Sequence, residues 1–231
     1  MKDNEIIKKM VDLLEIKSSD TVLEIGGGTG ALTQEIVARK PQKTIVVEID
    51  ERFKEELEKT GAEVIIGDIL KMNLPEADKI ISNVPYSICE PLMWKLIHLP
   101  RRTVLTLPEK FVERITAEKG EKTYSKLTLM MQSFFNIAKD SKVPPEAFEP
   151  EPKTTSRVVV LTPIKGKFFI KKLFLQQDKK VRNALRDALC DKGLTKKQAL
   201  EKLRKFPLPD KKVIELTLKE FEVLKTYKFN S

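Results

Sequence analysis

The sequence contains little of the chemistry that builds metal centres and disulfide frameworks. It has two cysteines and one histidine in 231 residues, and Cys89, Cys190 and His98 stand apart from any partner of matching type. No group of residues shows the spacing of metal ligands. We therefore expect a metal-free protein with reduced thiols, in which these three residues and Trp94 pack rather than carry chemistry.

Long hydrophobic runs are also missing. No apolar stretch approaches the ~20 residues that a membrane-spanning helix needs, and the first five residues lack the apolar core of a signal peptide. Hydrophobic residues make up 41% and charged residues 33% of the chain, which is typical of a soluble globular protein. We expect a cytoplasmic monomer with no membrane partner, built as one large domain or one domain with a small appendage.

Positive charge is distributed unevenly along the chain. Residues 164–231 hold 19 lysines and arginines against 8 aspartates and glutamates, whereas residues 1–163 hold 24 against 26. A nearly neutral body therefore carries a basic C-terminal part. Basic surface attracts polyanions through counterion release. The asymmetry favours contact with nucleic acid over the alternative, a solvated surface rich in lysine and glutamate as in heat-stable proteins.

Strand-like and helix-like segments alternate in the first two thirds of the chain. Apolar and β-branched runs predict strands at 21–25, 44–49, 63–66, 79–82 and 103–107. Helical spacing of apolar residues predicts helices at 4–16, 31–39, 51–59, 91–99, 109–119 and 124–133. This alternation is typical of an α/β fold, a doubly wound parallel sheet with helices on both faces. Two further strands, 134–139 and 158–162, are expected to pair with each other.

The segment 163–166 is expected to be a domain boundary. It follows a stiff loop, 144–152, that contains four prolines. Beyond it the strand signals fade, and the pattern predicts four short helices, at 171–177, 179–190, 196–205 and 211–224, with Thr195 capping the third. We interpret residues 1–163 as one domain and residues 164–231 as a small, basic helical domain that contacts RNA.

A glycine-rich loop follows the first predicted strand. Gly26, Gly28 and Gly30 form a G-x-G-x-G pattern, which permits a tight turn and close approach of a ligand to the backbone. The loop lacks the G-x-G-x-x-G spacing of dinucleotide sites and the Gly-Lys-Ser/Thr of a P-loop. Glu24, before the first glycine, disfavours a phosphate. It suits a ligand with positive charge, such as a sulfonium with its α-amine.

Polar residues also end the next three predicted strands. Glu48 can accept hydrogen bonds from both hydroxyls of a ribose. Asp68 can accept from an adenine amine while Ile69 packs against the ring, and Asn83 ends the fourth strand. Because parallel strands end at one edge of the sheet, these residues meet where such sheets bind ligands. Any one acid is equally compatible with a surface carboxylate or a helix cap, but polar residues at four matched strand ends indicate a nucleoside-type ligand.

The stretch Asn83-Val84-Pro85-Tyr86 suits methylation of an exocyclic amine. The lone pair of an adenine amine is delocalised into the ring, and two acceptors for its hydrogens turn that lone pair toward an electrophile. The Asn83 amide oxygen is one acceptor, and the carbonyl of Val84 or Pro85 is the second, held by the fixed φ of proline. Tyr86 can stack on the base. Taken alone, the stretch is equally a strand followed by a proline turn.

Together these motifs resemble the S-adenosylmethionine-dependent rRNA adenine dimethyltransferases. The matching segments are Glu24 to Gly30, Val47-Glu48-Ile49-Asp50, Gly67-Asp68 and Asn83 to Tyr86. Further matches are Pro-Glu-Lys-Phe-Val-Glu-Arg at 108–114, Tyr-Ser-Lys-Leu at 124–127, and the proline loop from Phe148 to Lys153 with Ser156. Order and spacing agree across residues 10–163, and the basic tail fits the small-subunit rRNA branch of this family.

The resemblance implies a role for each matching residue. It implies that S-adenosylmethionine, the methyl donor, is held by Glu24, Gly26, Gly28, Gly30, Glu48, Ile49, Asp68, Ile69 and Asn83. Asn83 and the Pro85 carbonyl would bind the target amine, and Tyr86 and Phe148 would sandwich the flipped base. Catalysis would rest on orientation and proximity, with no metal and no general base.

Two departures from the family pattern stand out. The family usually begins with a Gln-x-Phe-Leu or Asn-Phe-Leu segment that closes over donor and substrate, and Met1-Lys2-Asp3-Asn4 does not match it. We therefore expect either a shortened sequence or a pocket that closes differently. Thr154 also replaces the usual valine of the proline loop.

Three functions are compatible with these motifs. The first is dimethylation of two adjacent adenines near the 3′ end of small-subunit rRNA, on an immature 30S-type ribosomal subunit. The second is adenine methylation of large-subunit rRNA, since those enzymes share Asn-x-Pro-Tyr. The third is a ribosome-assembly or transcription factor that keeps the fold without turnover. DNA adenine methylation is disfavoured because no separate base-reading domain is evident.

Overall fold

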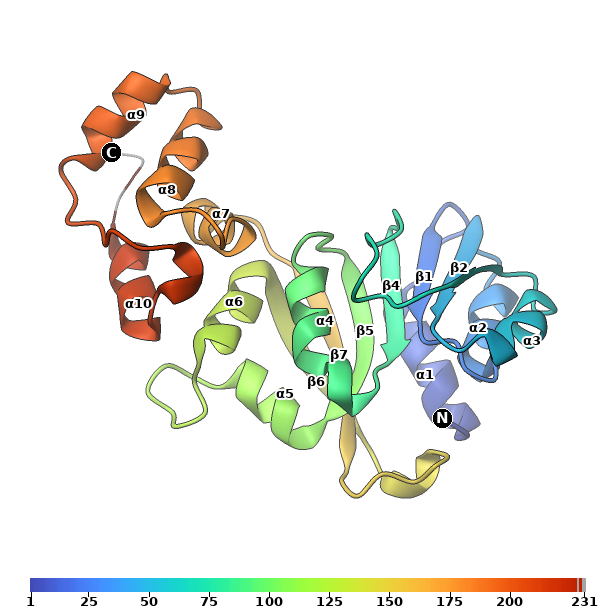
Figure 1. Ribbon diagram of the computed structural model, residues 1–231. Coiled ribbons are helices and arrows are strands. Elements are labelled where there is room, and N and C mark those ends of the chain that lie inside the picture. Colours follow the sequence, from blue (N-terminus) through green and yellow to red (C-terminus); the bar gives the residue numbers. More distant parts are fainter. Residues whose placement is uncertain (228, 230–231) are drawn as a thin grey trace.

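A seven-stranded sheet forms the centre of the protein (Figure 1), described by a computed structural model over residues 1–227 and 229. The strands are β1 (Thr21–Ile25), β2 (Lys43–Glu48), β3 (Glu63–Ile66), β4 (Lys79–Asn83), β5 (Arg102–Pro108), β6 (Phe135–Val143) and β7 (Ser156–Pro163). Their order in the sheet is β3-β2-β1-β4-β5-β7-β6. The first five are parallel, and β7 is antiparallel to both of its neighbours. The strand order reverses between β1 and β4, the point where open α/β sheets bind ligands.

Helices cover both faces of the sheet, because successive side chains of each strand point to opposite faces. The helices of the sheet region are α1 (Asn4–Leu14), α2 (Ala31–Ala38), α3 (Lys54–Glu58), α4 (Cys89–Leu96), α5 (Glu109–Thr116) and α6 (Lys126–Phe134). Val22 and Ile81 pack on one face with α1 and α2. Leu23 and Ile80 pack on the other face with α4, α5 and α6. The predicted α/β fold is confirmed, as is the pairing of the last two strands.

The first helix illustrates how the sequence specifies an element of this core. Its buried residues, Ile7, Met10, Val11 and Leu14, recur at helical spacing and face the sheet. The Asp3 side chain caps the helix by accepting two backbone N–H groups of the first turn. The helix thereby covers the sheet next to the proline loop, to which the N–H of residue 2 donates a backbone hydrogen bond.

The C-terminal part is helical, as the sequence predicts, with one correction. It contains α7 (Phe168–Leu175), α8 (Val181–Cys190), α9 (Lys196–Leu203) and α10 (Leu218–Thr226). The single helix expected at 211–224 is wrong: a short 3-10 turn, Val213–Glu215, is followed by the separate helix α10. Two contacts explain the break. Backbone hydrogen bonds join residues 211–213 to 179–181, and Thr217 forms a capping box with Glu220 that starts α10.

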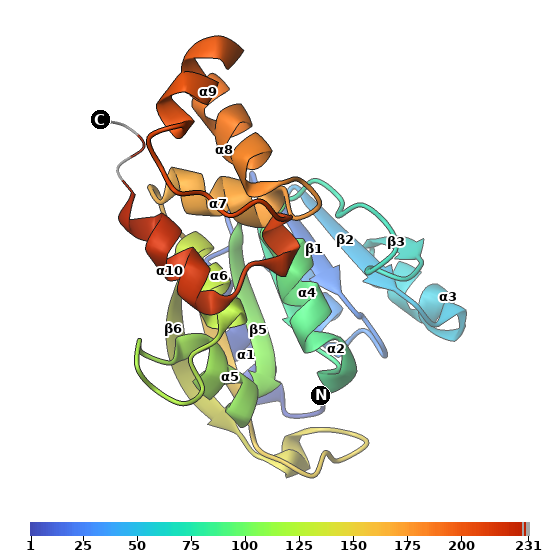
Figure 2. The same cartoon turned by 60° about the vertical axis from the view of Figure 1, so that its left-hand side comes forward.

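The C-terminal helices lie beside α4 and α6, toward the edge of the sheet where the parallel strands begin (Figures 1 and 2). β7 ends at Pro163, near the edge where the parallel strands begin, so α7 starts away from the glycine loop (Figures 1 and 2). Phe174 of α7 stacks on Phe221 at 4.6 Å and lies 6.0 Å from the Trp94 ring of α4. The hydrophobic core is therefore continuous between the two parts of the chain. None of the helices in the described residues is long and apolar enough to cross a membrane.

Candidate active site

The loop after β1 is shaped by its glycines. Gly26, Gly28 and Gly30 have φ angles of 78°, 50° and 79°, in the left-handed region that favours glycine. A Cβ at Gly26 or Gly28 would meet nothing within 4 Å, whereas a Cβ at Gly27 would lie 2.6 Å from a side-chain carbon of Val46. The loop is therefore closed against β2 on one side and open to a ligand on the other.

Glu48 joins this loop to the end of β2. Its side chain is 6% exposed, and its two oxygens accept hydrogen bonds from the backbone N–H groups of Gly28 at 2.8 Å and Asp50 at 2.9 Å. Each carboxylate oxygen has a second lone pair, so both oxygens can still accept from a ligand. The acid predicted to bind a ribose is thus held in place by the backbone of the glycine loop.

Glu24 lies beneath the loop, on the face covered by α2. The Thr33 hydroxyl donates to its carboxylate at 2.6 Å, and the residue is 1% exposed. Burial raises the pKa of Glu24 to about 8, opposed by the Thr33 hydrogen bond and reinforced by the charge of Glu48. The Glu24 carboxyl group is therefore mostly protonated at neutral pH, and it lies next to the hollow beside the glycine loop.

The residues predicted to contact an adenine ring lie after β2 and β3. Asp68 accepts the N–H of Leu70 at 2.9 Å, with the Lys71 ammonium 3.5 Å away, so its carboxylate is oriented by the turn that it caps. Ile69 is 6% exposed, but Ile49 is 68% exposed. An isoleucine that projects into solvent beside Glu48 offers an apolar surface for a flat ring.

The turn after β4 presents two carbonyl groups with different surroundings. The Pro85 carbonyl accepts the N–H of Ile88 at 3.0 Å and lies 3.7 Å from the Cys89 sulfur, so it belongs to the turn that leads into α4. No hydrogen bond to the Val84 carbonyl is found among residues 1–227 and 229. Asn83, the last residue of β4, is half-buried at the strand end.

Tyr86 is anchored through its hydroxyl group. The hydroxyl lies 2.5 Å from the Ser156 Oγ and donates to the Thr154 carbonyl at 3.3 Å, while the residue remains 38% exposed. Ser156 is fully buried at the start of β7. The Asn-x-Pro-Tyr stretch and the proline loop with Ser156 therefore contact each other. This contact fixes the hydroxyl end of the Tyr86 ring, which was predicted to stack on a base.

Phe148 occupies a different environment. It is 7% exposed and belongs to the hydrophobic cluster of α1, with Ile7 and Met10. Stacking on a base, as expected for it, would require the ring to be uncovered. The role of Phe148 as the second face for a base stays a prediction.

A hollow of about 180 Å³ brings the glycine loop and Asn83 together. Its lining residues are Met1, Glu24, Gly26, Gly27, Gly28, Thr29, Ala31, Leu32, Phe53, Asn83 and Glu149. The other residues predicted to hold the donor or the base lie outside this lining: Gly30, Glu48, Ile49, Asp68, Ile69, Pro85, Tyr86 and Phe148. Sequence reasoning missed Phe53, whose only signal was an aromatic residue shortly after the acid of β2, and Glu149, which the proline loop brings to the mouth.

The first residue also lies at this hollow, although residues 1–4 do not match the family's Gln-x-Phe-Leu segment. Met1 lines the hollow, and the N–H of Lys2 donates to the Ala147 carbonyl at 2.8 Å. The pKa of the Met1 amine is lowered by burial, against the opposing charge of Glu149. No cluster of three His, Cys, Asp or Glu side chains suited to a metal ion occurs in the described part of the chain.

The fold and the site together define a Rossmann-like methyltransferase. The strand order reverses next to a glycine loop, Glu48 ends β2 and Asp68 follows β3. Asn83, the first residue of the Asn-x-Pro-Tyr stretch, ends β4 and lines the same hollow as the glycine loop. Among solved structures, a dimethyladenosine transferase from Plasmodium falciparum is similar over 97% of this chain and 94% of its own, with a TM-score of 0.69 and 31% identity. The 23S rRNA methyltransferase ErmE, at 20% identity and a TM-score of 0.64, shares the fold over 97% of both chains.

Sequence comparisons show to which family of methyltransferases the chain belongs. The profile of the family described as ribosomal RNA adenine dimethylase matches residues 1–226. Two relatives named as probable ribosomal RNA small subunit methyltransferase A, from Thermococcus sibiricus and Pyrococcus furiosus, are 33% and 34% identical, and each alignment covers 96% of this chain and 87% of the relative. The chain belongs to the ribosomal RNA adenine dimethylase family. It is therefore an rRNA adenine methyltransferase, as the resemblance predicted.

Proposed function

We propose that this protein transfers methyl groups from S-adenosylmethionine to the exocyclic amines of two adjacent adenines near the 3′ end of small-subunit rRNA, during ribosome biogenesis in the cytoplasm. The observation that carries the proposal is that Asn83 lines the same hollow as Gly26 and Gly28. Donor and acceptor sites thus adjoin. In this proposal a monomer acts, residues 1–163 perform the chemistry, and residues 164–231 contact the RNA.

The residues of the hollow, together with those at the neighbouring ends of β2 and β3, fit a cationic nucleoside as methyl donor. When bound, the donor supplies an electrophilic methyl group on its sulfonium. The open faces of Gly26 and Gly28 admit it close to the backbone, and the free lone pairs of Glu48 accept the ribose hydroxyls. Asp68 accepts from the adenine amine, and Ile49 supplies the apolar surface for its ring.

Asn83 and one backbone carbonyl orient the target amine. The Asn83 amide oxygen accepts one N6 hydrogen of the target adenine. The resemblance assigns the second acceptor to the Pro85 carbonyl, which already accepts the N–H of Ile88 with one of its two lone pairs. We prefer the Val84 carbonyl, since no hydrogen bond among residues 1–227 and 229 engages it. With both hydrogens bound, the N6 lone pair faces the methyl group, a near-attack geometry that lowers the barrier through orientation.

The transfer needs no general base. The N6 lone pair forms the new bond to the methyl carbon while the carbon–sulfur bond breaks and its electron pair returns to sulfur. The methylated amine is then cationic and acidic, and water takes its proton. Asn83 suits this sequence because its neutral amide accepts hydrogen bonds without a fixed charge. A second round on the same nitrogen completes the dimethylated base, with Tyr86 stacking on the ring throughout.

The test of the proposal is to map the modified nucleotides. Purified protein and methyl donor are incubated separately with immature small and large ribosomal subunits, and the rRNA nucleosides are identified by mass spectrometry. Dimethyladenosine at two neighbouring positions near the 3′ end of the small-subunit rRNA is expected. Modification of the large-subunit rRNA alone would assign the chain to the related resistance-type activity instead.

Donor binding should depend on pH through Glu24. A nearby sulfonium and ammonium favour the ionised carboxylate, so donor binding drives off the proton held by a group whose pKa is about 8. The affinity for S-adenosylmethionine should therefore rise up to about tenfold per pH unit from pH 6 to 8 and level off above. Calorimetric titrations at several pH values measure this slope. Glu24→Gln keeps an acceptor for Thr33 and should reduce the dependence of donor affinity on pH. An unchanged pH dependence would refute the assignment of this effect to Glu24.

The same shift has a consequence for folding stability. The pKa of Glu24 is higher in the folded protein than in the unfolded chain, so the folded state holds the proton more tightly. Its contribution to stability is present at acidic pH and is lost as the pH rises through about 8. The Glu24→Gln variant should remove this loss as well.

The basic tail should position the RNA through its phosphates. Lys179 and Lys180 pair with Asp187 and Asp210, yet their side chains remain 50% and 57% exposed. Charge reversal of Lys179, Lys180 and Arg182 should weaken RNA binding and reduce the slope of log affinity against log salt by roughly one per lost phosphate contact. Filter-binding assays over a salt series test this. Charge reversal of Lys43, a paired surface lysine on β2, is the matched control; equal effects of the two changes would contradict a specific role of the tail.

A further inference from the structure

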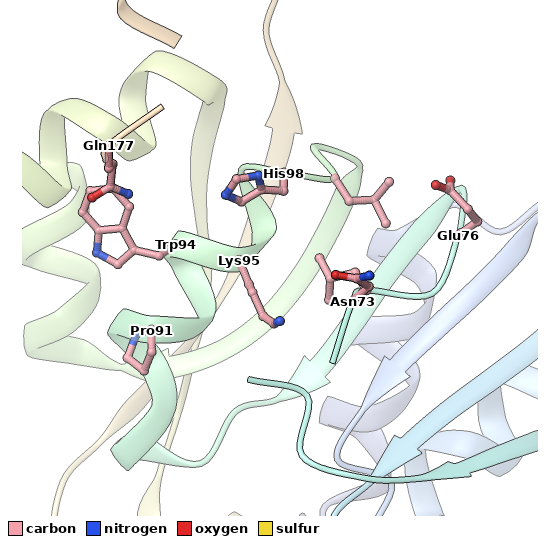
Figure 3. A pocket seen from close by; sticks show the side chains of 9 residues that line it. Asn73, Glu76, Pro91, Trp94, Lys95, His98 and Gln177 are labelled. Carbon is pink, nitrogen blue, oxygen red and sulfur yellow. The ribbon is translucent and has the colours of Figure 1, made fainter. Parts of the chain in front are cut away.

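A second hollow, of about 480 Å³, lies on the outer side of α4. One stripe of this helix and its C-terminal turn forms the floor, with Pro91, Trp94, Lys95 and His98 at helical spacing. Asn73 and Glu76 of the β3–β4 loop line one wall, and Gln177, after α7, lies on the Trp94 side (Figure 3). The hollow thus lies where the sheet region meets the basic tail.

The polar groups around this hollow have unused hydrogen-bonding capacity. Among residues 1–227 and 229, no hydrogen bond engages the side chains of Asn73, Trp94, His98 or Gln177. Two amides, an imidazole and an indole N–H together offer both donors and acceptors. Lys95 adds a cation, anchored by a hydrogen bond to the Met72 carbonyl. Such a set can bind the edge of a nucleobase.

The aromatic side chains supply a stacking surface. Trp94 contacts Phe174 on one side at a ring distance of 6.0 Å and stays partly exposed on the other. His98, one turn further along, is exposed, so the expectation that it packs in the interior is wrong. Unpaired RNA bases are commonly held by stacking on aromatic side chains and by hydrogen bonds to their edges.

The surroundings of the hollow suit a phosphate backbone. Gln177 is followed closely by the exposed Lys179 and Lys180. The half-exposed Arg101 lies 4.0 Å from Glu76, an exposed acid of the lining. The lining itself contains one cation, Lys95, and one carboxylate, Glu76. The other cations stand close in sequence to residues of the lining. A single strand that crosses the hollow would run from the sheet region onto the tail.

The hollow is also well placed relative to the target site. Helix α4 begins directly after the Tyr86–Ile88 turn and ends at Leu96, and His98 follows in the turn that leads toward β5. The helix of eight residues spans about 12 Å. The target turn therefore precedes the first turn of α4, whereas the hollow runs along the helix from Pro91 to His98. The end of the hollow at Trp94 and His98 lies farthest from the target turn, at roughly the length of a few nucleotides of a single strand.

We propose that this hollow binds an unpaired nucleotide of the same rRNA, its base stacked on Trp94 and His98 and its edge bound by Asn73 and Gln177. The inference rests on the proposed function in taking rRNA as the partner, and adds a second contact site for it. A base held here would anchor the strand at the far end of α4 while the target adenine enters at Asn83. Its contribution would be to RNA affinity, not to the methyl-transfer step.

Trp94 provides a direct measurement, since it is the only tryptophan of the chain. Its fluorescence is followed while the full protein is titrated with a single-stranded RNA of six adenylates and, separately, with adenosine monophosphate. Saturable quenching by the RNA is expected, with much weaker binding of the mononucleotide. His98→Ala and Gln177→Ala should each weaken RNA binding about fivefold or more, with the salt slope unchanged because no phosphate contact is lost.

Matched controls are Asn136→Ala and Gln42→Ala, two exposed amides outside the hollow. They should leave RNA binding unaltered. Unchanged affinity of the His98 and Gln177 variants, or mononucleotide binding as tight as that of the RNA, would overturn the inference. Methylation of small-subunit rRNA by the same variants separates the two proposals: a raised KM for RNA with unchanged kcat is expected. If the unaltered protein methylates no rRNA but the variants still lose RNA binding, the proposed function is contradicted while the proposed RNA-binding role of the hollow is supported.

Discussion

Asn83→Ala should reduce methyl transfer by about 100-fold or more at saturating donor and RNA, because the amide that orients the target amine is lost. The residue ends β4 between the glycine loop and the Tyr86 turn, so no neighbouring side chain replaces its oxygen. Single-turnover assays with radiolabelled donor measure the effect on the chemical step. RNA affinity should change little, since the tail and the second hollow remain intact.

The control for this variant is Asn136→Ala, the same change on the exposed edge strand β6. It should retain full activity. The Asn83 variant also distinguishes an enzyme from an assembly factor. Ribosome maturation that continues with Asn83→Ala while methylation stops would show that the protein has an assembly role separate from turnover. Full methylation by Asn83→Ala would contradict the proposed catalytic geometry.

Glu48→Gln should weaken binding of S-adenosylhomocysteine by about 10- to 150-fold. Hydrogen bonds to a charged group contribute about 1.5–3 kcal/mol, which corresponds to that range of affinity. The change also places an amide N–H₂ against the backbone N–H of Gly28 or Asp50, which now donate to the two carboxylate oxygens. The glycine loop would lose the contact that holds it in position. Isothermal titration calorimetry reports both the affinity and the binding enthalpy.

Glu63→Gln is the matched control for this measurement. Glu63 lies at the opposite end of β3 from the site and pairs with Lys43 on the surface. Surface pairs of this kind contribute little, so donor binding and stability should stay close to the unaltered protein. Equal losses in the two variants would show that the Glu48 effect is not specific to the donor site.

The strand-end residues of the site could be predicted because they depend on local pattern alone. Parallel strands end at one edge, so Glu48 and Asn83 had to lie near the glycine loop once the strands were recognised. The positive φ angles of Gly26 and Gly28 follow from the same turn. For these residues, the local sequence pattern was enough to predict their position in the fold.

Contacts between distant segments could not be predicted in the same way. The hydroxyl of Tyr86 reaches Ser156, 70 positions further on, and both residues were known only as separate motifs. The burial of Phe148 depends on how α1 covers the proline loop. The break before α10 depends on backbone pairing of residues 211–213 with the start of α8. Each is decided by tertiary packing, which overrides local propensity.

The position of the basic tail bears on how RNA is bound. The sequence predicted a basic helical part but not its location, which is beside α4 and α6, away from the glycine loop (Figure 1). Helix α4 connects the two regions, since it begins after the Tyr86–Ile88 turn and contacts α7 through Trp94 and Phe174. We therefore propose that RNA bound to both the tail and Asn83 runs along α4. This route passes the hollow at Trp94 and His98.

The most direct test of this account is mass spectrometry of the small-subunit rRNA after incubation of immature subunits with the purified protein and S-adenosylmethionine. We expect dimethyladenosine at two adjacent positions near the 3′ end with the unaltered protein and its loss with Asn83→Ala. Absence of dimethyladenosine with the unaltered protein, although donor binding is confirmed by calorimetry, would contradict the account.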